Sequence, residues 1–353
     1  MFERDVFNWS AISKCKKQLY GIAILWIMLL HGLVRGAKAS LGNHLSFLTP
    51  LITHGQYGVE IFLFLSGIYL YFSLKKNCNF SEFYKKRLIR ILVPYLAITG
   101  TYWFVLCVCI KHNLIRFIGN ITQYTFWFGH VHFAWYIGAI LLFYFIYPFI
   151  FKYLLADKSN RFSFVSILIL TIIVYALCFL LKHSGFGTIT DWYKEVEIAL
   201  TRLPDFLLGC YCGKLVYTKR QISKLTLAIA SLFFIGGIVL MYMNDVYMSF
   251  YRIPGLIFAI SFCILFPPIL SSLDISGINQ ALSWLGKASL ELYLFHLVAQ
   301  NTTVFLHLYG HSKTGNYVRY LVYCVLGSVI VIWMLKPILD RLSNRIRASI
   351  LHN

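Results

Sequence analysis

Residues Leu19–His31 read LYGIAILWIMLLH, an apolar run that ends in a titratable side chain. A membrane-spanning α-helix needs about 20 predominantly apolar residues, so we expect a first transmembrane helix over residues 19–36. About thirty residues after His31, a second apolar segment carries Glu60. Titratable groups within a bilayer are costly and by default mark a functional site. His31 and Glu60 are therefore the first candidates for the chemistry of this protein.

The composition is that of a multipass membrane protein. Of the 353 residues, 59% are hydrophobic and 13% are charged, whereas soluble domains contain about 25% charged residues. We predict an all-α, polytopic membrane helix bundle that forms a single domain over residues 1–353, with about ten transmembrane helices. The predicted spans are residues 19–36, 57–74, 91–110, 133–151, 163–181, 203–217, 225–243, 252–270, 288–308 and 317–337.

The net charge of +19 follows membrane topology rather than a nucleic-acid surface. If the N-terminus is cytoplasmic and ten helices follow, 22 of the 32 Lys and Arg residues fall on the inner side. This bias is the positive-inside rule, and it predicts that both termini are cytoplasmic. The basic residues before the first apolar run, without a small-residue cleavage site after it, indicate a signal anchor. We expect a bacterial inner (plasma) membrane location, with the lipid bilayer and not nucleic acid as partner.

The nine cysteines do not indicate disulfides. In the predicted topology Cys15 and Cys78 are cytoplasmic, the other seven lie in helices, and no outer loop contains one. We interpret them as small apolar packing residues, because buried free cysteine behaves in that way.

The depths of His31 and Glu60 predict that they meet. At 1.5 Å per residue, His31 lies about 18 Å from the cytoplasmic end of its helix and Glu60 about 5 Å below the outer surface. A carboxylate beside an imidazole fixes its tautomer and raises its basicity, as a general base requires. The alternative for His31 is a histidine hydrogen-bonded between helices.

A basic cluster precedes the third predicted helix. Residues 85–90 read KKRLIR, and Lys75 and Lys76 end the helix before them. Arg87 and Arg90 are three residues apart and share one helix face, and their guanidinium groups suit bidentate phosphate binding. The lysines, Lys86 included, also fit a loop that fixes topology or meets anionic lipid.

The ninth predicted helix contains a second acidic and histidine pair. Residues 289–296 read SLELYLFH. Glu291 and His296 are five residues apart, which places them about 140° apart around the helix. We therefore predict that each has its own partner, in a structural or a catalytic role.

The longer predicted outer loops, residues 37–56, 111–132 and 182–202, carry polar groups that suit a polar acceptor; solvated loops without substrate contact are the alternative. These residues are His44, His54, His130, His132, Asp191, Glu195 and Glu197.

Taken together, these segments resemble the acyltransferase 3 family, integral membrane enzymes that acylate, usually acetylate, cell-surface carbohydrates and related acceptors. The resemblance covers nearly the whole chain. The similar segments are Tyr20–His31 with the family's catalytic histidine, Gly58–Gly67 with Glu60 where the family more often has Asp, Arg87–Arg90 followed by Pro94-Tyr95, Trp135-Tyr136, Arg202-Leu203-Pro204 with Gly209, and Leu285–His296.

One position departs from the family pattern. The family usually carries a basic residue eleven positions before the histidine, and Tyr20 stands there. Eleven residues advance 20° beyond three full helical turns, so Tyr20 shares a face with His31. The resemblance implies that this position contacts the acyl donor. Tyr20 then indicates either that Lys16 or Lys17 takes over this role or that the chain represents a divergent subgroup.

The resemblance implies an O-acyltransferase that moves an acyl group, most often acetyl, from cytoplasmic acyl-CoA to a hydroxyl of a cell-surface glycan. It implies catalytic roles for His31 and Glu60, donor binding by Lys86, Arg87 and Arg90, and no metal. The supporting residues would be Tyr20, Trp135, Tyr136, Arg202, Glu291 and His296. Two alternatives remain: a transporter or flippase with a Glu/His proton relay, and a sensor or assembly protein with a degenerate site.

Overall fold

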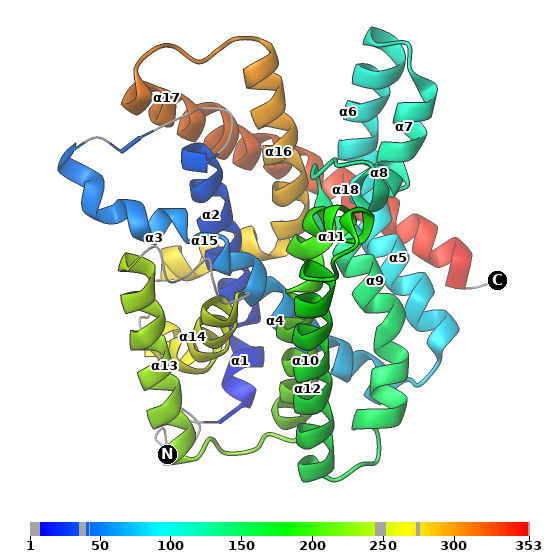
Figure 1. Ribbon diagram of the computed structural model, residues 1–353, viewed down its shortest axis with the longest axis vertical. Coiled ribbons are helices and arrows are strands. Elements are labelled where there is room, and N and C mark those ends of the chain that lie inside the picture. Colours follow the sequence, from blue (N-terminus) through cyan, green and yellow to red (C-terminus); the bar gives the residue numbers. More distant parts are fainter. Residues whose placement is uncertain (1–7, 35–39, 42, 244–251, 273–275, 352–353) are drawn as a thin grey trace.

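The computed structural model describes residues 8–34, 40–41, 43–243, 252–272 and 276–351, which are almost entirely helical (Figure 1). The shorter helices are α1 (Ser10–Lys14), η1 (Asn43–Leu48), α3 (Thr49–Thr53), α6 (Thr101–Trp103), α7 (Leu114–Ile121), α8 (Tyr124–Phe128), α11 (Gly187–Leu200), α15 (Ser276–Lys287) and α17 (Lys313–Tyr320). The longer ones are α2 (Lys16–Val34), α4 (Tyr57–Lys76), α5 (Phe80–Pro94), α9 (Trp135–Ile150), α10 (Asn160–Lys182), α12 (Leu203–Tyr217), α13 (Lys224–Tyr242), α14 (Ile253–Ser272), α16 (Ser289–Phe305) and α18 (Gly327–Leu351). The π-helical segments η2 (Tyr95–Gly100), η3 (Phe104–Ile110), η4 (Phe151–Leu155) and η6 (Leu321–Leu326) connect or extend them.

Among the described residues, seven helices are long and apolar enough to cross a membrane. The structure therefore confirms an all-helical membrane-type fold, and ten spans remain a prediction. The three predicted spans outside this set, residues 19–36, 203–217 and 288–308, form α2, α12 and α16. α2 carries His31, α16 carries Glu291 and His296, and α12 carries Asp205 and is preceded directly by Arg202. With 15 and 17 residues, α12 and α16 are shorter than the about 20 residues that a spanning helix needs.

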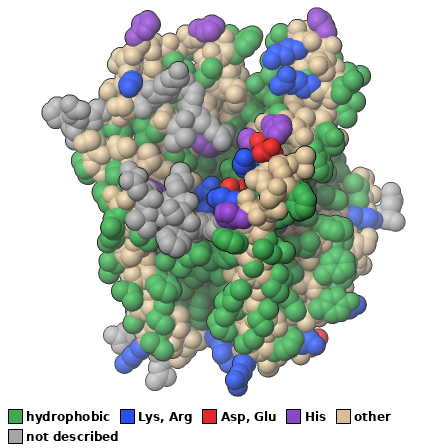
Figure 2. Space-filling view, viewed as in Figure 1, with side chains coloured by type: hydrophobic (Ala, Val, Ile, Leu, Met, Phe, Trp, Pro, Cys, Tyr) green, Lys and Arg blue, Asp and Glu red, His purple; other side chains and the backbone are tan. Residues whose placement is uncertain are grey.

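The central and peripheral helices differ in burial. In α4 and the helical segment before it, 83% of the apolar window is buried, against 17% in both α10 and α13. Figure 2 shows apolar side chains over much of the lateral surface. The peripheral helices therefore present a lipid-compatible surface around a core built on α4.

Contacts between loops join segments that the predicted topology places on the same side of the membrane. At one end of the bundle, the backbone of Trp9 donates to Arg220 O, and Lys75 contacts Asp157 at 3.4 Å. At the other end, residues 40 and 313, and residues 56 and 252, are hydrogen-bonded to each other. The first set contains segments predicted to be cytoplasmic and the second contains predicted outer segments. Which end faces the cytoplasm remains a prediction.

Glycines allow the central helices to approach closely. A Cβ atom added at Gly209 of α12 would overlap the backbone of Phe64 in α4, and one added at Gly286 of α15 would overlap the backbone of Lys17 in α2. Small residues at such contacts let membrane helices pack backbone against backbone. This packing places α4 and α12 so that Glu60 and Arg202 meet.

Candidate functional site

A cavity of about 1190 Å³ lies among α2, α4, α5, α9, α16 and α18. Ligand pockets are commonly about 300–1,000 Å³, so this cavity has room for a nucleotide-sized ligand. Nine basic side chains and two acidic ones, Glu291 and Asp340, line it. The basic residues are Lys16, Lys17, Lys76, Lys86, Arg87, Arg90, Lys287, Lys336 and Arg347.

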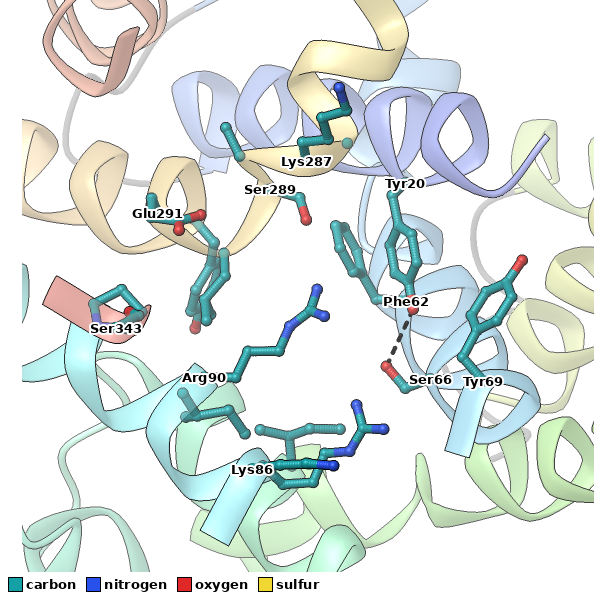
Figure 3. A pocket seen from close by; sticks show the side chains of 18 of the residues that line it. Tyr20, Phe62, Ser66, Tyr69, Lys86, Arg90, Lys287, Ser289, Glu291 and Ser343 are labelled. Atoms are coloured by element: carbon teal, nitrogen blue, oxygen red, sulfur yellow. Dashed lines mark hydrogen bonds between the residues drawn. The ribbon is translucent and has the colours of Figure 1, made fainter. Parts of the chain in front are cut away.

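The three residues predicted to bind the donor all line this cavity. Arg90 extends from α5 into the space between Ser289 and Ser66 (Figure 3). The Nε atom of Arg87 is buried without a hydrogen-bond partner among the described residues, whereas Lys86 forms an ion pair with Glu82. The two arginines therefore offer guanidinium donors to an anion, and Lys86 is already partly neutralised.

Tyr20, at the position where the family usually has a basic residue, lies inside the cavity. Its hydroxyl is 3.5 Å from Ser66 Oγ (Figure 3), while Lys16 and Lys17 also line the cavity. The Lys16 ammonium lies 3.6 Å from the centre of the Tyr69 ring. The structure thus places both predicted substitutes for the missing basic residue at the same cavity.

Lys16 precedes the predicted first span, and its environment is strongly cationic. Burial, followed by the positive charges of Arg90, Arg87 and Lys17, lowers the pKa of Lys16 to about 7. Like charges held this close in the absence of an anion raise the free energy of the protonated lysine. An anionic ligand in the cavity would relieve this repulsion.

A continuous row of aromatic rings leads from the cationic part of the cavity to His296. The ring centres are 6.3 Å apart for Tyr69 and Tyr20, and 5.1 Å apart for Tyr20 and Phe62. The row continues from Phe62 to Tyr136 at 6.3 Å and from Tyr136 to Tyr293 at 5.5 Å. These five residues line the cavity. Tyr293 then lies 5.8 Å from the ring of His296, which packs behind this wall and, like His31, is not among the residues that line the cavity.

His31 and His296 contact each other directly. Nδ1 of His31 lies 2.7 Å from Nε2 of His296, and the two rings are stacked with their centres 5.0 Å apart. Nδ1 of His296 lies 2.9 Å from the carbonyl oxygen of Leu292. The sequence analysis singled out both histidines but did not pair them, because helical geometry alone does not indicate which helices α2 and α16 face.

The predicted pairing of Glu60 with His31 is wrong. Glu60 is fully buried, and its Oε1 lies 3.1 Å from Nε of Arg202, which is 2% exposed. The Arg202 guanidinium also lies 5.0 Å from the ring of Trp135. A guanidinium carries a full positive charge and compensates a buried carboxylate better than a neutral imidazole does. Glu60, Arg202 and Trp135, all predicted site residues, thus form one buried cluster.

The predicted separation of Glu291 from His296 is confirmed. Glu291 Oε1 lies 2.9 Å from Lys336 Nζ, which also contacts Asp340 at 2.7 Å. The sequence analysis missed Lys336. A lysine within the apolar run of the last helix, between Leu335 and Pro337, is the signal that would have found it.

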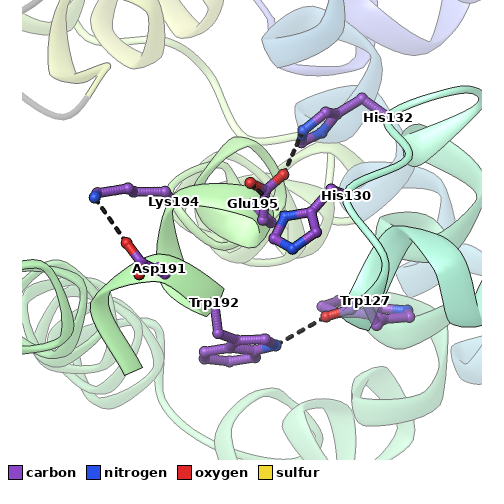
Figure 4. Close-up of polar contacts among 7 residues, drawn as sticks. All are labelled: Trp127, His130, His132, Asp191, Trp192, Lys194 and Glu195. Carbon is purple, nitrogen blue, oxygen red and sulfur yellow. Dashed lines mark hydrogen bonds and ion pairs between the residues drawn. The ribbon is translucent and has the colours of Figure 1, made fainter. Parts of the chain in front are cut away.

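Three residues of the predicted outer loops form a second polar cluster. Glu195 of α11 contacts His130 at 2.7 Å and His132 at 2.8 Å, and Trp192 Nε1 donates to the Trp127 carbonyl at 2.8 Å (Figure 4). The hydrogen bond from His130, followed by that from His132, lowers the pKa of the Glu195 carboxyl, although partial burial opposes the shift. These contacts hold α8 and the loop between α8 and α9 against α11.

The remaining outer-loop candidates lie apart from this cluster or outside the described side chains. Asp191 pairs with Lys194 at 2.9 Å, and Glu197 lies 3.6 Å from Lys182. His54 is buried, with Nδ1 2.7 Å from the Pro50 carbonyl oxygen. The side chain of His44 is not described. All nine cysteines are free thiols; seven are buried, and Cys78 and Cys109 are exposed.

Comparison with known proteins gives one family. The acyltransferase 3 family model, described as an acyltransferase domain, matches residues 19–336. No curated protein and no solved structure matches the chain. The matched segment begins just before Tyr20, includes the histidine pair and ends at Lys336. Because this match covers most of the 353 residues, the chain belongs to the acyltransferase 3 family and is an acyltransferase.

Proposed function

We propose that this protein transfers an acyl group, acetyl in the first instance, from acyl-CoA to a hydroxyl of a cell-surface glycan in a bacterial inner membrane. One observation carries the proposal: a cavity lined by nine basic side chains has an aromatic wall whose last ring, Tyr293, packs against the His31–His296 pair. Coenzyme A has the matching chemistry, with a polyphosphate at one end and a thin apolar and amide arm that ends in the thioester.

Donor binding follows from the charges. Arg87 and Arg90 would hold the phosphates, because their guanidinium groups bind phosphate oxygens in pairs. Lys16, Lys17 and Lys287 add positive charge around them. The pantetheine arm would then lie against Tyr20, Phe62, Tyr136 and Tyr293, which brings the thioester toward His31. Ser66 and Tyr20 offer hydroxyl groups to the amides of this arm.

In the proposed reaction His31 acts as the general base. It takes the proton of the acceptor hydroxyl while the hydroxyl oxygen attacks the thioester carbonyl carbon. A C–O bond forms, the C–S bond breaks, and the proton passes to the thiolate of coenzyme A. In a second route His31 itself accepts the acyl group and passes it on. Direct transfer requires a ternary complex, whereas the covalent route gives ping-pong kinetics.

The buried cluster of Glu60, Arg202 and Trp135 supports the site from the other side of α4. We propose that it holds α12 and α9 in place around Tyr136, which follows Trp135 and lines the cavity. The His130–Glu195–His132 cluster, on loops predicted to be outside, presents polar groups and aromatic rings suited to an acceptor sugar.

The transporter alternative needs titratable groups that exchange protons along a path. The relay would consist of the intramembrane residues Glu60, Glu291, His31 and His296. Glu60 pairs with Arg202, and Glu291 pairs with Lys336. Carboxylates neutralised by adjacent cations are poor members of a proton relay, so this arrangement favours the enzyme.

The test is transfer of radiolabelled acetyl-CoA, supplied to the cytoplasmic face of inverted vesicles, into the envelope carbohydrate fraction. His31→Ala should reduce label by at least about 100-fold, as expected when a general base is removed. Arg87→Ala combined with Arg90→Ala should raise KM for acetyl-CoA about tenfold or more.

Lys85→Ala is the matched control, because Lys85 belongs to the same basic cluster but does not line the cavity and donates to the Ile350 carbonyl instead. It should transfer label as the wild type does. Equal transfer by wild type and His31→Ala would contradict the assignment of His31. An absence of label with the wild type as well as with every variant, while a radiolabelled glycan or lipid-linked sugar is transported, would favour the transporter.

A further inference from the structure

One contact of the histidine pair shows which ring nitrogens carry hydrogens. Nδ1 of His296 lies 2.9 Å from the Leu292 carbonyl oxygen, and a carbonyl oxygen accepts hydrogen bonds but does not donate them. Nδ1 of His296 therefore carries a hydrogen. His296 is fully buried, and burial disfavours a charged imidazolium, while a neutral ring satisfies both contacts given for its nitrogens, the Leu292 carbonyl oxygen at Nδ1 and the His31 ring at Nε2. In the neutral ring, Nε2 of His296 is then an acceptor.

The contact between the rings completes the assignment. Since Nε2 of His296 accepts, Nδ1 of His31, at 2.7 Å, donates the hydrogen. A neutral His31 that carries its hydrogen on Nδ1 has its lone pair on Nε2. Of the two ring nitrogens of His31, Nε2 is thus the one with basic and nucleophilic character.

We infer that His296 is a positioning residue for the acyl transfer: it holds His31 in the Nδ1–H tautomer through the hydrogen-bonded chain from His31 to His296 to the Leu292 carbonyl, so that Nε2 of His31 reacts. The inference rests on the proposed function for its catalytic meaning. The sequence analysis assigned this task to Glu60, which the structure pairs with Arg202 instead.

The chain also explains how His31 is stabilised once it has taken a proton. Protonation at Nε2 makes His31 a cation whose Nδ1–H still points at Nε2 of His296. The His296 ring, polarised by its own hydrogen bond to Leu292, remains a neutral acceptor for that hydrogen. A carboxylate in this position would attract the cation more strongly, whereas a neutral acceptor orients the ring without adding a buried charge.

The contact between α2 and α16 does not depend on the His296 ring alone, so His296 variants can be tested in the folded protein. The side chain of Gln300 donates to the His31 carbonyl at 3.0 Å, and Tyr320 donates to the Met28 carbonyl at 2.6 Å. Both contacts hold the end of α2 against α16 and the segment that follows it.

The experiment compares His296→Gln with His296→Leu in the purified full chain in nanodiscs. The amide oxygen of Gln can accept the hydrogen from His31 Nδ1, whereas Leu offers no acceptor. His296→Gln should keep kcat within about tenfold of wild type, and His296→Leu should lower kcat about 100-fold or more at an unchanged KM for acetyl-CoA. The acidic limb of the pH profile should shift in His296→Leu and stay in place in His296→Gln. His183→Leu, an exposed histidine away from the cavity, is the control.

A second measurement does not require acyl transfer. In protein labelled with ¹⁵N and ¹³C histidine, the His31 signals are identified by their loss in His31→Ala. The protonated nitrogen of His31 should correlate with Cγ in wild type and in His296→Gln, which identifies Nδ1–H, and the Nε2–H form should appear in His296→Leu.

Equal loss of kcat in the Gln and Leu variants, or an Nε2–H tautomer of His31 in the wild type, would overturn the inference. The tautomer measurement stays valid even if no acyl transfer is found, so a failure of the proposed function is distinguishable from a failure of this inference.

Discussion

Glu60 and Arg202 are buried almost completely, and each is the compensation for the other's charge. When one member of a buried ion pair is removed, the remaining charge has no partner, which costs about 3–5 kcal/mol. Glu60 lies in α4 and Arg202 directly precedes α12, so this cost falls on the packing of α4 against α12.

We predict that Glu60→Gln and Arg202→Gln each destabilise the protein by about 3 kcal/mol, and that the double variant is destabilised by less than the sum. The measurement is thermal unfolding in detergent at constant lipid content. Additive effects in this cycle would show that the two side chains do not act as a pair.

Lys16 predicts a pH dependence of donor binding. Its pKa is lowered to about 7 by burial and by the cations around it, so it loses its charge as the pH rises through 7. Polyphosphate binding favours the charged form and therefore takes up protons. We expect the affinity for coenzyme A to fall by up to about tenfold per pH unit above pH 7, the limit for one linked proton.

Calorimetric titration with coenzyme A in buffers of different ionisation enthalpy measures this uptake directly. Lys16→Met should abolish the uptake between pH 7 and 8, and Lys85→Met, which changes an exposed lysine that does not line the cavity, should retain it. Uptake that is unchanged in Lys16→Met would assign the proton to another group.

At the scale of elements, the site depends on how closely α4 and α12 approach. Gly67 and Gly209 are the contact points, since an added Cβ at either position would overlap the backbone of the other helix. A methyl group there would move α12, and with it Arg202, away from Glu60. Interior overpacking of this kind costs about 1–3 kcal/mol.

We therefore predict that Gly209→Ala lowers the stability by about 1–3 kcal/mol and also reduces acyl transfer. Gly236→Ala is the matched control, because Gly236 lies within α13 with no atom within 4 Å of an added Cβ. It should leave stability unchanged or raise it slightly, since alanine favours helix more than glycine does. Melting temperatures of both variants, measured side by side, check the prediction.

At the scale of the whole molecule, the bundle separates a basic end from an opposite end that carries the outer-loop cluster. Cys78, in the loop between α4 and α5, is exposed at the end that also contains Lys75 and Asp157. Lys111 is exposed after η3, at the far end of the same helical hairpin.

In a Cys109→Ser background, we expect a membrane-impermeant maleimide to modify Cys78 in inverted vesicles but not in intact cells. The Cys78→Ser/Lys111→Cys variant should show the reverse. Modification of both positions from the same side would contradict the prediction that the two loops lie on opposite sides of the membrane. If Cys78 reacted only in intact cells and the cysteine of Lys111→Cys only in inverted vesicles, the topology would be the reverse of the predicted one and the donor cavity would open to the outside.

Composition, hydropathy and motifs in the sequence were enough to predict the helical membrane class and the family. Hydropathy is a local property of the chain. The sequence therefore shows directly that His31, Glu60, Glu291 and His296 lie in apolar segments. Periodicity within one helix likewise placed Arg87 beside Arg90 and separated Glu291 from His296.

The contacts among these residues follow from the packing of the helices against each other. This packing paired His31 with His296 rather than with Glu60, gave Glu60 to Arg202, and brought Lys336 from the last helix to Glu291. The physical reason is that the face of a helix on which a residue lies is set by local geometry. The helix that this face meets is set by packing between segments far apart in the sequence, such as those of His31 and His296, 265 residues apart. Close contacts at glycines and the pairing of buried charges determine which helices pack together, and the sequence pattern of a single helix does not predict this packing.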